Sequence, residues 1–120
     1  METITLRQEL KEHLKKLQSL ESGWYDGSGQ KIESSIFETV EYLLKLFQTR
    51  NILEPDIGPT EEGTILFKWW SGNMLGILDL TGYSFKLDFV EDCVVNTHLF
   101  NLSETTNLLD KLQCFSSHNK

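Results

Sequence analysis

The sequence feature that most resembles an ion-binding loop is the run Asp-Gly-Ser-Gly that begins at Asp26. A calcium loop of the EF-hand type needs oxygen ligands at its first, third and twelfth positions and glycine at its sixth. With Asp26 as the third ligand, Trp24 would be the first and Ser35 the twelfth. With Asp26 as the first, Lys31 would replace the glycine and Phe37 the last ligand. Both registers fail, so we predict a tight turn in which Asp26 caps backbone amides and the glycines adopt positive φ.

The histidines and paired acids do not form a recognisable catalytic or metal-binding pattern. His13, His98 and His118 are far apart in sequence and form no i, i+4 pair. No group of residues supplies a nucleophile, a base and an electrophile together. We therefore predict that the protein is not an enzyme and holds no cofactor or metal. A pocket around Asp79, His98 and Trp24 is retained as the site of a less favoured hydrolase or ligand-binding function.

Trp24 and the two cysteines are expected to have structural roles. We predict that Trp24 covers the core between helices and sheet. Cys93 and Cys114 both have apolar neighbours in sequence, which is typical of small buried side chains in a reducing cytosol. The fold does not require a disulfide between them.

The excess of acidic residues is concentrated in the middle third of the chain. The 120 residues include 18 acidic and 11 basic side chains, a net charge of -7. Residues 54–92 contain eight acidic residues and two lysines, which accounts for -6 of that total. Such a field repels nucleic acid phosphates and speeds association with a basic protein surface. Plain solubility is the alternative explanation.

Length and hydropathy indicate one domain over residues 1–120. The sequence has no stretch of 18 apolar residues, so we predict no membrane span. Its first residues are charged and carry no apolar signal segment, which predicts a cytoplasmic protein.

Three helices are expected. The first helix is predicted at about residues 5–20 by a stripe of leucines along one face. The stripe consists of Leu6, Leu10, Leu14 and Leu17. The second covers about residues 35–49, where Ser35 and Glu38 match a capping box. Prolines and a glycine then indicate an extended connection of about ten residues. Ser103 is the expected N-cap of the last helix, which has Leu108, Leu109 and Leu112 on its buried side and Phe115 near its end.

From residue 64 the hydrophobic period changes from 3.6 to 2 residues, which is typical of strands. We predict strands at about 64–70, 74–80, 83–90 and 93–100, joined by links so short that they must be antiparallel hairpins. The predicted fold is α+β: two N-terminal helices, a four-stranded antiparallel meander and a C-terminal helix (ααββββα). Residues 116–120 are expected to fray.

Large apolar residues fall on both faces of the predicted sheet. Trp69 and Trp70 are adjacent in one strand, so they point to opposite faces. We expect Trp70 to lie near Met74 or Leu78 across the hairpin. Either a helix lies on each side of the sheet or an apolar patch is exposed, and the sequence leaves both open. An exposed patch of this composition with a charged rim is typical of protein interfaces.

The candidate partner-binding residues are aromatic and acidic: Trp70, Tyr83, Asp88, Glu91, Asp92, Glu61 and Glu62, with Lys86 beside them.

Two motifs suggest relatives. Residues 23–29 read GWYDGSG, and residues 59–69 read PTEEGTILFKW. This layout resembles a broad group of small, mostly uncharacterised bacterial proteins with a GW-(D/N)-G-x-G turn and a P-T-x-x-G-x-I-x-h-x-W strand entry, where h is hydrophobic. The resemblance covers about residues 10–90. It implies a short cytosolic α+β protein and no catalytic residue.

Our first functional hypothesis is a non-enzymatic, acidic protein-binding module. Small proteins of this kind include antitoxins, immunity proteins and phage-encoded inhibitors of host defence, which block larger, basic enzymes that act on nucleic acids. The carboxylates would occupy a Lys/Arg groove while the aromatic residues anchor the complex. The alternative is a self-associating accessory or structural subunit that buries its outward apolar strand residues in a homodimer. Direct binding to nucleic acid or to a membrane is not expected.

Overall fold

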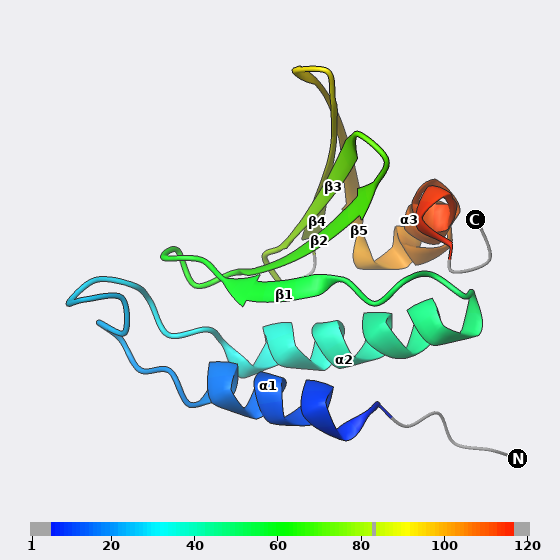
Figure 1. Ribbon diagram of the computed structural model, residues 1–120. Helices are drawn as coiled ribbons and strands as arrows, with labels where there is room; N and C mark the ends of the chain where they lie inside the picture. The colour runs from blue at the N-terminus through cyan, green and yellow to red at the C-terminus, as the bar shows by residue number, and fades with distance from the viewer. Residues whose placement is uncertain (1–5, 83, 117–120) are drawn as a thin grey trace, which may run out of the picture.

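The computed structural model describes residues 6–82 and 84–116. Its elements are α1 (Gln8–Gln18), α2 (Ser34–Thr49), β1 (Asp56–Pro59), β2 (Ile65–Ser71), β3 (Met74–Leu80), β4 (Ser84–Glu91), β5 (Val94–Asn101), the 3-10 turn η1 (Leu102–Glu104), α3 (Thr105–Lys111) and the 3-10 turn η2 (Leu112–Phe115). The strands form one antiparallel sheet in the order β1-β2-β3-β4-β5. α1 and α2 lie side by side, β1 runs along α2, and the sheet twists from there until the β4–β5 turn projects away from the helices (Figure 1).

The predicted α+β class is confirmed, but the sheet has five strands instead of four. The additional strand, β1, lies in the segment predicted as an extended connection. It pairs with β2 from Asp56 opposite Lys68 to Pro59 opposite Ile65. Proline is compatible with this position because β1 is an edge strand, where a missing N–H need not interrupt the ladder. The observed order is therefore ααβββββα.

Both predicted helix caps are wrong. α2 begins at Ser34, so Ser35 lies inside the first turn and Glu33 takes the N-cap position. The cap of the C-terminal helical segment is Asn101, because β5 extends to that residue. Its side chain accepts a hydrogen bond from the Ser103 amide at 3.0 Å, and its own amide donates to Glu104 at 3.0 Å.

The chain ends of the described region are held by packing and pairing. The leucine stripe predicted for the first helix is buried, although Leu6 precedes α1, and so are the apolar residues named for the last helix: Leu6, Leu10, Leu14, Leu17, Leu108, Leu109, Leu112 and Phe115. Ser116 forms an isolated bridge with Ile52. The first helix is shorter than the expected 5–20: it begins at Gln8 and ends at Gln18. Residues 117–120, the rest of the tail expected to fray, lie outside the described residues.

α2 and the C-terminal helical segment cover the same face of the sheet. Phe47 of α2 contacts Phe67 and Trp69 edge-on, with ring centroids 5.9 and 5.5 Å apart. Phe115 of η2 stacks on Trp69 and on Phe89, at 5.6 and 6.1 Å. Trp69 and Phe89 share one face because both lie opposite Gly76. The core therefore occupies one side of the sheet.

Gly76 provides the space that Phe115 occupies. A Cβ atom at this position would lie 2.7 Å from two ring carbons of Phe115. We therefore expect Gly76→Ala to lower the free energy of unfolding by about 1–3 kcal/mol, measured by urea denaturation. Gly58→Ala in β1 is the matched control, because a Cβ there meets nothing within 4 Å. Equal losses in the two variants would contradict this packing.

Candidate protein-binding face of the sheet

The side of the sheet opposite Trp69 receives no helix in the described part of the chain. We call it the open face. The strand registers place on it alternate residues of all five strands, namely Asp56, Gly58, Leu66, Lys68, Trp70, Leu75, Ile77, Asp79, Ser84, Lys86, Asp88, Val90, Val95, Thr97, Leu99 and Asn101. Of the two arrangements that the sequence left open, the structure has the exposed apolar patch.

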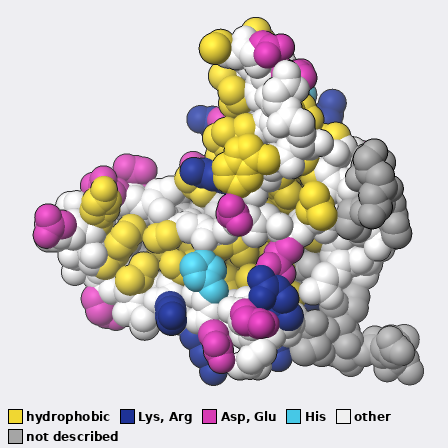
Figure 2. Space-filling view, in the orientation of Figure 1, with side chains coloured by type: hydrophobic (Ala, Val, Ile, Leu, Met, Phe, Trp, Pro, Cys, Tyr) yellow, Lys and Arg dark blue, Asp and Glu magenta, His cyan; other side chains and the backbone are white. Residues whose placement is uncertain are grey.

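Four apolar residues from neighbouring strands line up across one end of the open face. Trp70 lies opposite Leu75, Leu75 opposite Val90, and Val90 opposite Val95. We call these four the apolar row; at the usual strand spacing it is about 15 Å long. Trp70 is 56% exposed and Val95 55%. Figure 2 shows hydrophobic side chains at the surface of the upright part of the sheet. An exposed row of this kind is typical of an interaction surface.

The neighbour of Trp70 differs from the predicted one. Met74 and Leu78 lie on the helix-covered side, and Leu75 takes the place opposite Trp70. The reason is the turn between β2 and β3, which has two residues instead of the expected three and closes with Ser71 opposite Met74.

The rest of the open face mixes charges of both signs. Asp56, Lys68, Ile77, Asp88 and Thr97 form the row beside the apolar row. Thr97 donates a hydrogen bond to Asp88 at 2.6 Å. The next row adds Asp79 and Lys86. Three aspartates against two lysines give the open face a formal charge of only -1, so most of the net charge of -7 lies outside this face.

Four of the predicted partner-binding residues lie along or beside the apolar row. Trp70 and Asp88 are on the open face itself. Glu91 and Asp92 are exposed at the β4–β5 turn, next to Val90. Acidic side chains gather at this projecting tip in Figure 2. This end of the sheet thus combines apolar area with an acidic rim.

The other predicted residues lie elsewhere. Glu61 and Glu62 precede β2, so about 20 Å of strand separates them from Trp70. The Glu61 carboxylate accepts a hydrogen bond from Ser28 at 3.1 Å, and its carbonyl accepts one from the Gln30 amide at 2.8 Å. Glu61 therefore holds the loop before α2. Tyr83 lies outside the described residues.

That loop contains the predicted tight turn. Asp26 and Gly27 both have positive φ, 50° and 95°, so Asp26 helps to form the turn through its own backbone conformation. The Trp24 indole donates to the carbonyl of Gln30 at 2.9 Å and packs over Gly29, where a Cβ would lie 2.9 Å from the ring. Trp24 thus packs on its own loop, and the prediction that it covers the core is wrong.

Asp79, His98 and Trp24 do not converge on one pocket. Asp79 is on the open face, whereas His98 lies opposite Leu87 on the helix-covered face and packs on Phe89 at 5.8 Å. Trp24 lies in the loop before α2. His118 is outside the described residues, and within them no three His, Cys, Asp or Glu side chains are grouped to share a metal ion.

The predicted burial of both cysteines is wrong. Cys93 is exposed because β5 starts at Val94, one residue later than predicted, which leaves Cys93 in the turn with φ 66°. Cys114 is also exposed as a residue and hydrogen-bonds to the Lys111 carbonyl at 3.5 Å. Partial desolvation raises the pKa of its thiol, which disfavours the reactive thiolate.

A hollow of about 450 Å³ opens at the end of the open face farthest from the apolar row. Asp79, Lys86 and Leu99 are among its lining residues. The Asp79 Oδ1 atom is buried and has no hydrogen-bond partner within the described residues. An unsatisfied oxygen of this kind destabilises a fold by about 1–3 kcal/mol. A donor from a bound molecule would satisfy it.

We therefore expect Asp79→Leu to raise the free energy of unfolding by about 1 kcal/mol in urea denaturation, because it removes an unpaired buried oxygen. Asp88→Leu is the control on the same face. It removes an acceptor that Thr97 uses, so we expect it to lower stability by about 1 kcal/mol. Similar destabilisation by both changes would indicate that Asp79 is already paired in solution.

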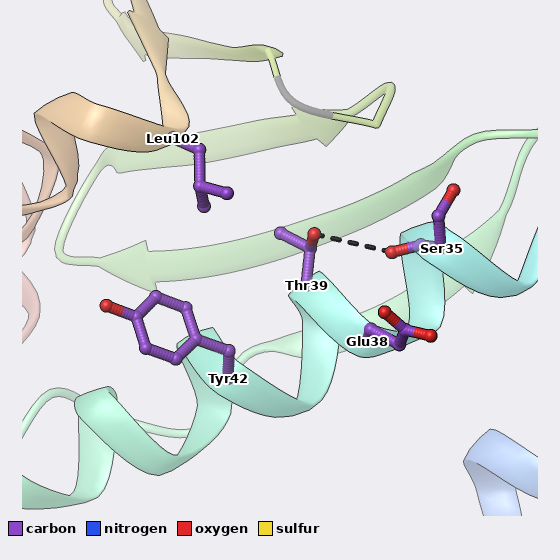
Figure 3. Close-up of a pocket in the computed structure, with 5 residues that line it drawn as sticks. All are labelled: Ser35, Glu38, Thr39, Tyr42 and Leu102. Carbon is purple, nitrogen blue, oxygen red and sulfur yellow. Dashed lines mark hydrogen bonds between the residues drawn. The ribbon is translucent and has the colours of Figure 1, made fainter.

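A second hollow, of about 310 Å³, lies between α2 and η1 (Figure 3). It is lined by Ser35, Glu38, Thr39, Tyr42 and Leu102. Thr39 donates to the Ser35 carbonyl at 3.4 Å, and the hydroxyls of Tyr42 and Ser35 point in opposite directions. These polar groups do not converge on a reacting atom, so the hollow does not have the geometry of a catalytic site.

Neither the helices nor the comparisons with known proteins add a further functional assignment. Across residues 6–82 and 84–116, no helix has both the length and the apolar character needed to cross a bilayer. The resemblance to small bacterial α+β proteins stays a prediction. The chain matches no family model, no curated protein and no solved structure.

Proposed function

We propose that the protein is a non-enzymatic binding module that docks on a larger protein through its open face. The observation that carries this proposal is the exposure of the apolar row beside a fully formed core. Removing apolar surface from water contributes about 25 cal/mol per Å², so covering a tryptophan and three aliphatic side chains favours a complex. Tryptophan is also among the residues that most often anchor protein interfaces.

A basic partner surface fits the charges around the apolar row. Glu91 and Asp92 are exposed at one end of it, and the chain carries a net charge of -7. At the other end of the open face, the unpaired oxygen of Asp79 would accept a hydrogen bond from a lysine or an arginine. Acidic surroundings would also accelerate the encounter with such a partner.

The partner class that we favour is an enzyme that acts on nucleic acids, because its substrate groove must be basic. The open face would cover that groove, with Trp70 as the anchor and the carboxylates in place of phosphates. The protein would then act as an inhibitor, an antitoxin or an immunity-type protein. The small size and the acidity of the protein support this class of partner. Because the open face is nearly neutral, apolar contacts would contribute more to anchoring the complex than charge would.

The test compares capture of a partner by matched variants. The immobilised wild-type protein is incubated with lysate of its source cell, and bound proteins are identified by mass spectrometry. We expect Trp70→Ala to reduce the bound amount of the partner at least about tenfold, as for a typical interface anchor. Tyr42→Ala is the control, because Tyr42 is also an exposed aromatic, at 50%, but lies on α2 in the second hollow.

Salt separates the electrostatic part of the proposal from the apolar part. Raising NaCl from about 50 mM to about 500 mM should weaken capture of a basic partner, since exposed charges are then screened. Binding that is lost in Tyr42→Ala but kept in Trp70→Ala would refute docking through the open face. A complex indifferent to salt would refute the basic partner.

A further inference from the structure

The two edges of the sheet are protected very differently. β1 has four residues, begins with Asp56 and ends with Pro59. β5 has eight residues and contains no proline and no Lys, Arg, Asp or Glu. Natural edge strands are usually kept from pairing by charges, prolines, bulges or shortness. β5 therefore has neither the charges nor the prolines that protect an edge, and it is twice as long as β1.

The free hydrogen-bonding groups of β5 can be identified from its hairpin. The two-residue turn between β4 and β5 closes with Glu91 opposite Val94. In such a hairpin the closing pair is hydrogen-bonded, and alternate pairs along the ladder follow it. Val95, Thr97 and Leu99 therefore turn their N–H and C=O groups toward the free edge. These groups can pair with another antiparallel strand.

We propose that a second copy of this chain pairs with β5, antiparallel and with the two-fold axis at Thr97. This register is favoured because residues 94–100 of β5 then each face a side chain of the same kind, apolar or polar. Val95 lies opposite Leu99 of the second copy. On the helix-covered face, Val94 lies opposite the second copy's Phe100 and Asn96 opposite its His98. On the open face, Thr97 lies opposite Thr97 of the second copy. Apolar cross-strand pairs of this kind stabilise a sheet.

Neighbouring registers lose this match. A shift of two residues would place Val95 opposite Thr97 or Asn101 and Leu99 opposite Cys93 or Thr97. The pattern is thus complementary to itself in one register, as a two-fold symmetric contact requires. The absence of charge on β5 also avoids like-charge repulsion between identical strands. These features favour a second copy over an unrelated peptide as the occupant.

The pairing would extend both the sheet and the apolar row. Two five-stranded sheets would join into one continuous sheet. The row that runs from Trp70 to Val95 would continue into Leu99 of the second copy. Val95 and Leu99 are 55% and 74% exposed in the single chain, so substitutions there should leave the core intact.

The test uses two single variants and their mixture. Sedimentation velocity should show the wild-type protein as a dimer. Val95→Lys and Leu99→Glu should each raise the dimer dissociation constant at least about tenfold, because each places a charge opposite an apolar side chain. Mixed in equal amounts, the two variants should form a heterodimer, in which one contact pairs lysine with glutamate and the other keeps leucine opposite valine. Ser84→Lys, on the open face but in β4, is the control that should leave the dimer unchanged.

Circular dichroism establishes that each variant remains folded. A wild-type protein that stays monomeric would overturn the proposal, as would single variants that dimerise like the wild type. A mixture that fails to form a heterodimer would overturn the proposed register and with it the two-fold contact at Thr97. All of these results are independent of any partner that binds the open face.

Discussion

The packing of Trp69 between two aromatic rings determines which side of the sheet is buried. Phe47 meets it edge-on from α2 and Phe115 stacks on it from η2, while its indole N–H donates to the Leu53 carbonyl at 2.7 Å. Segments from both ends of the chain are therefore held on the same face. Gly76 makes this possible because its missing side chain admits the Phe115 ring. The core is completed although no helix within residues 6–82 and 84–116 covers the other face.

The neighbouring residue, Trp70, is exposed for the same reason. Successive residues of a strand point to opposite faces, so burial of Trp69 directs Trp70 to the open face. The exposure of a tryptophan beside three aliphatic residues is the feature on which the proposed binding function rests. The open face and the edge of β5 meet at Val95, so a docking partner and a second copy of the chain would share one continuous surface.

The sequence predicted the elements with strong periodicity and missed those defined by single residues. The strands β2 to β5 were placed within one residue, and the helix α1 within three. β1 was missed because four residues with a terminal proline carry no alternation of their own. Alternation also shows which residues share a face but not which face the helices cover, so the exposure of Trp70 required coordinates. The unpaired oxygen of Asp79 likewise depends on neighbours from separate strands. A one-residue error in the start of β5 was enough to misplace Cys93.

The projecting β4–β5 hairpin has a consequence for motion. Its tip lies beyond the helices, and Val94 and Val95 there are 60% and 55% exposed. Local opening is easiest where few apolar contacts must be broken, so amide hydrogens near this tip should exchange sooner than those beside Trp69. We therefore expect the apolar row to be stiffer at its β2 end, next to Trp69, than at its β5 end. Such a difference in stiffness would let the β5 end adjust its shape to a bound partner while the β2 end keeps its orientation.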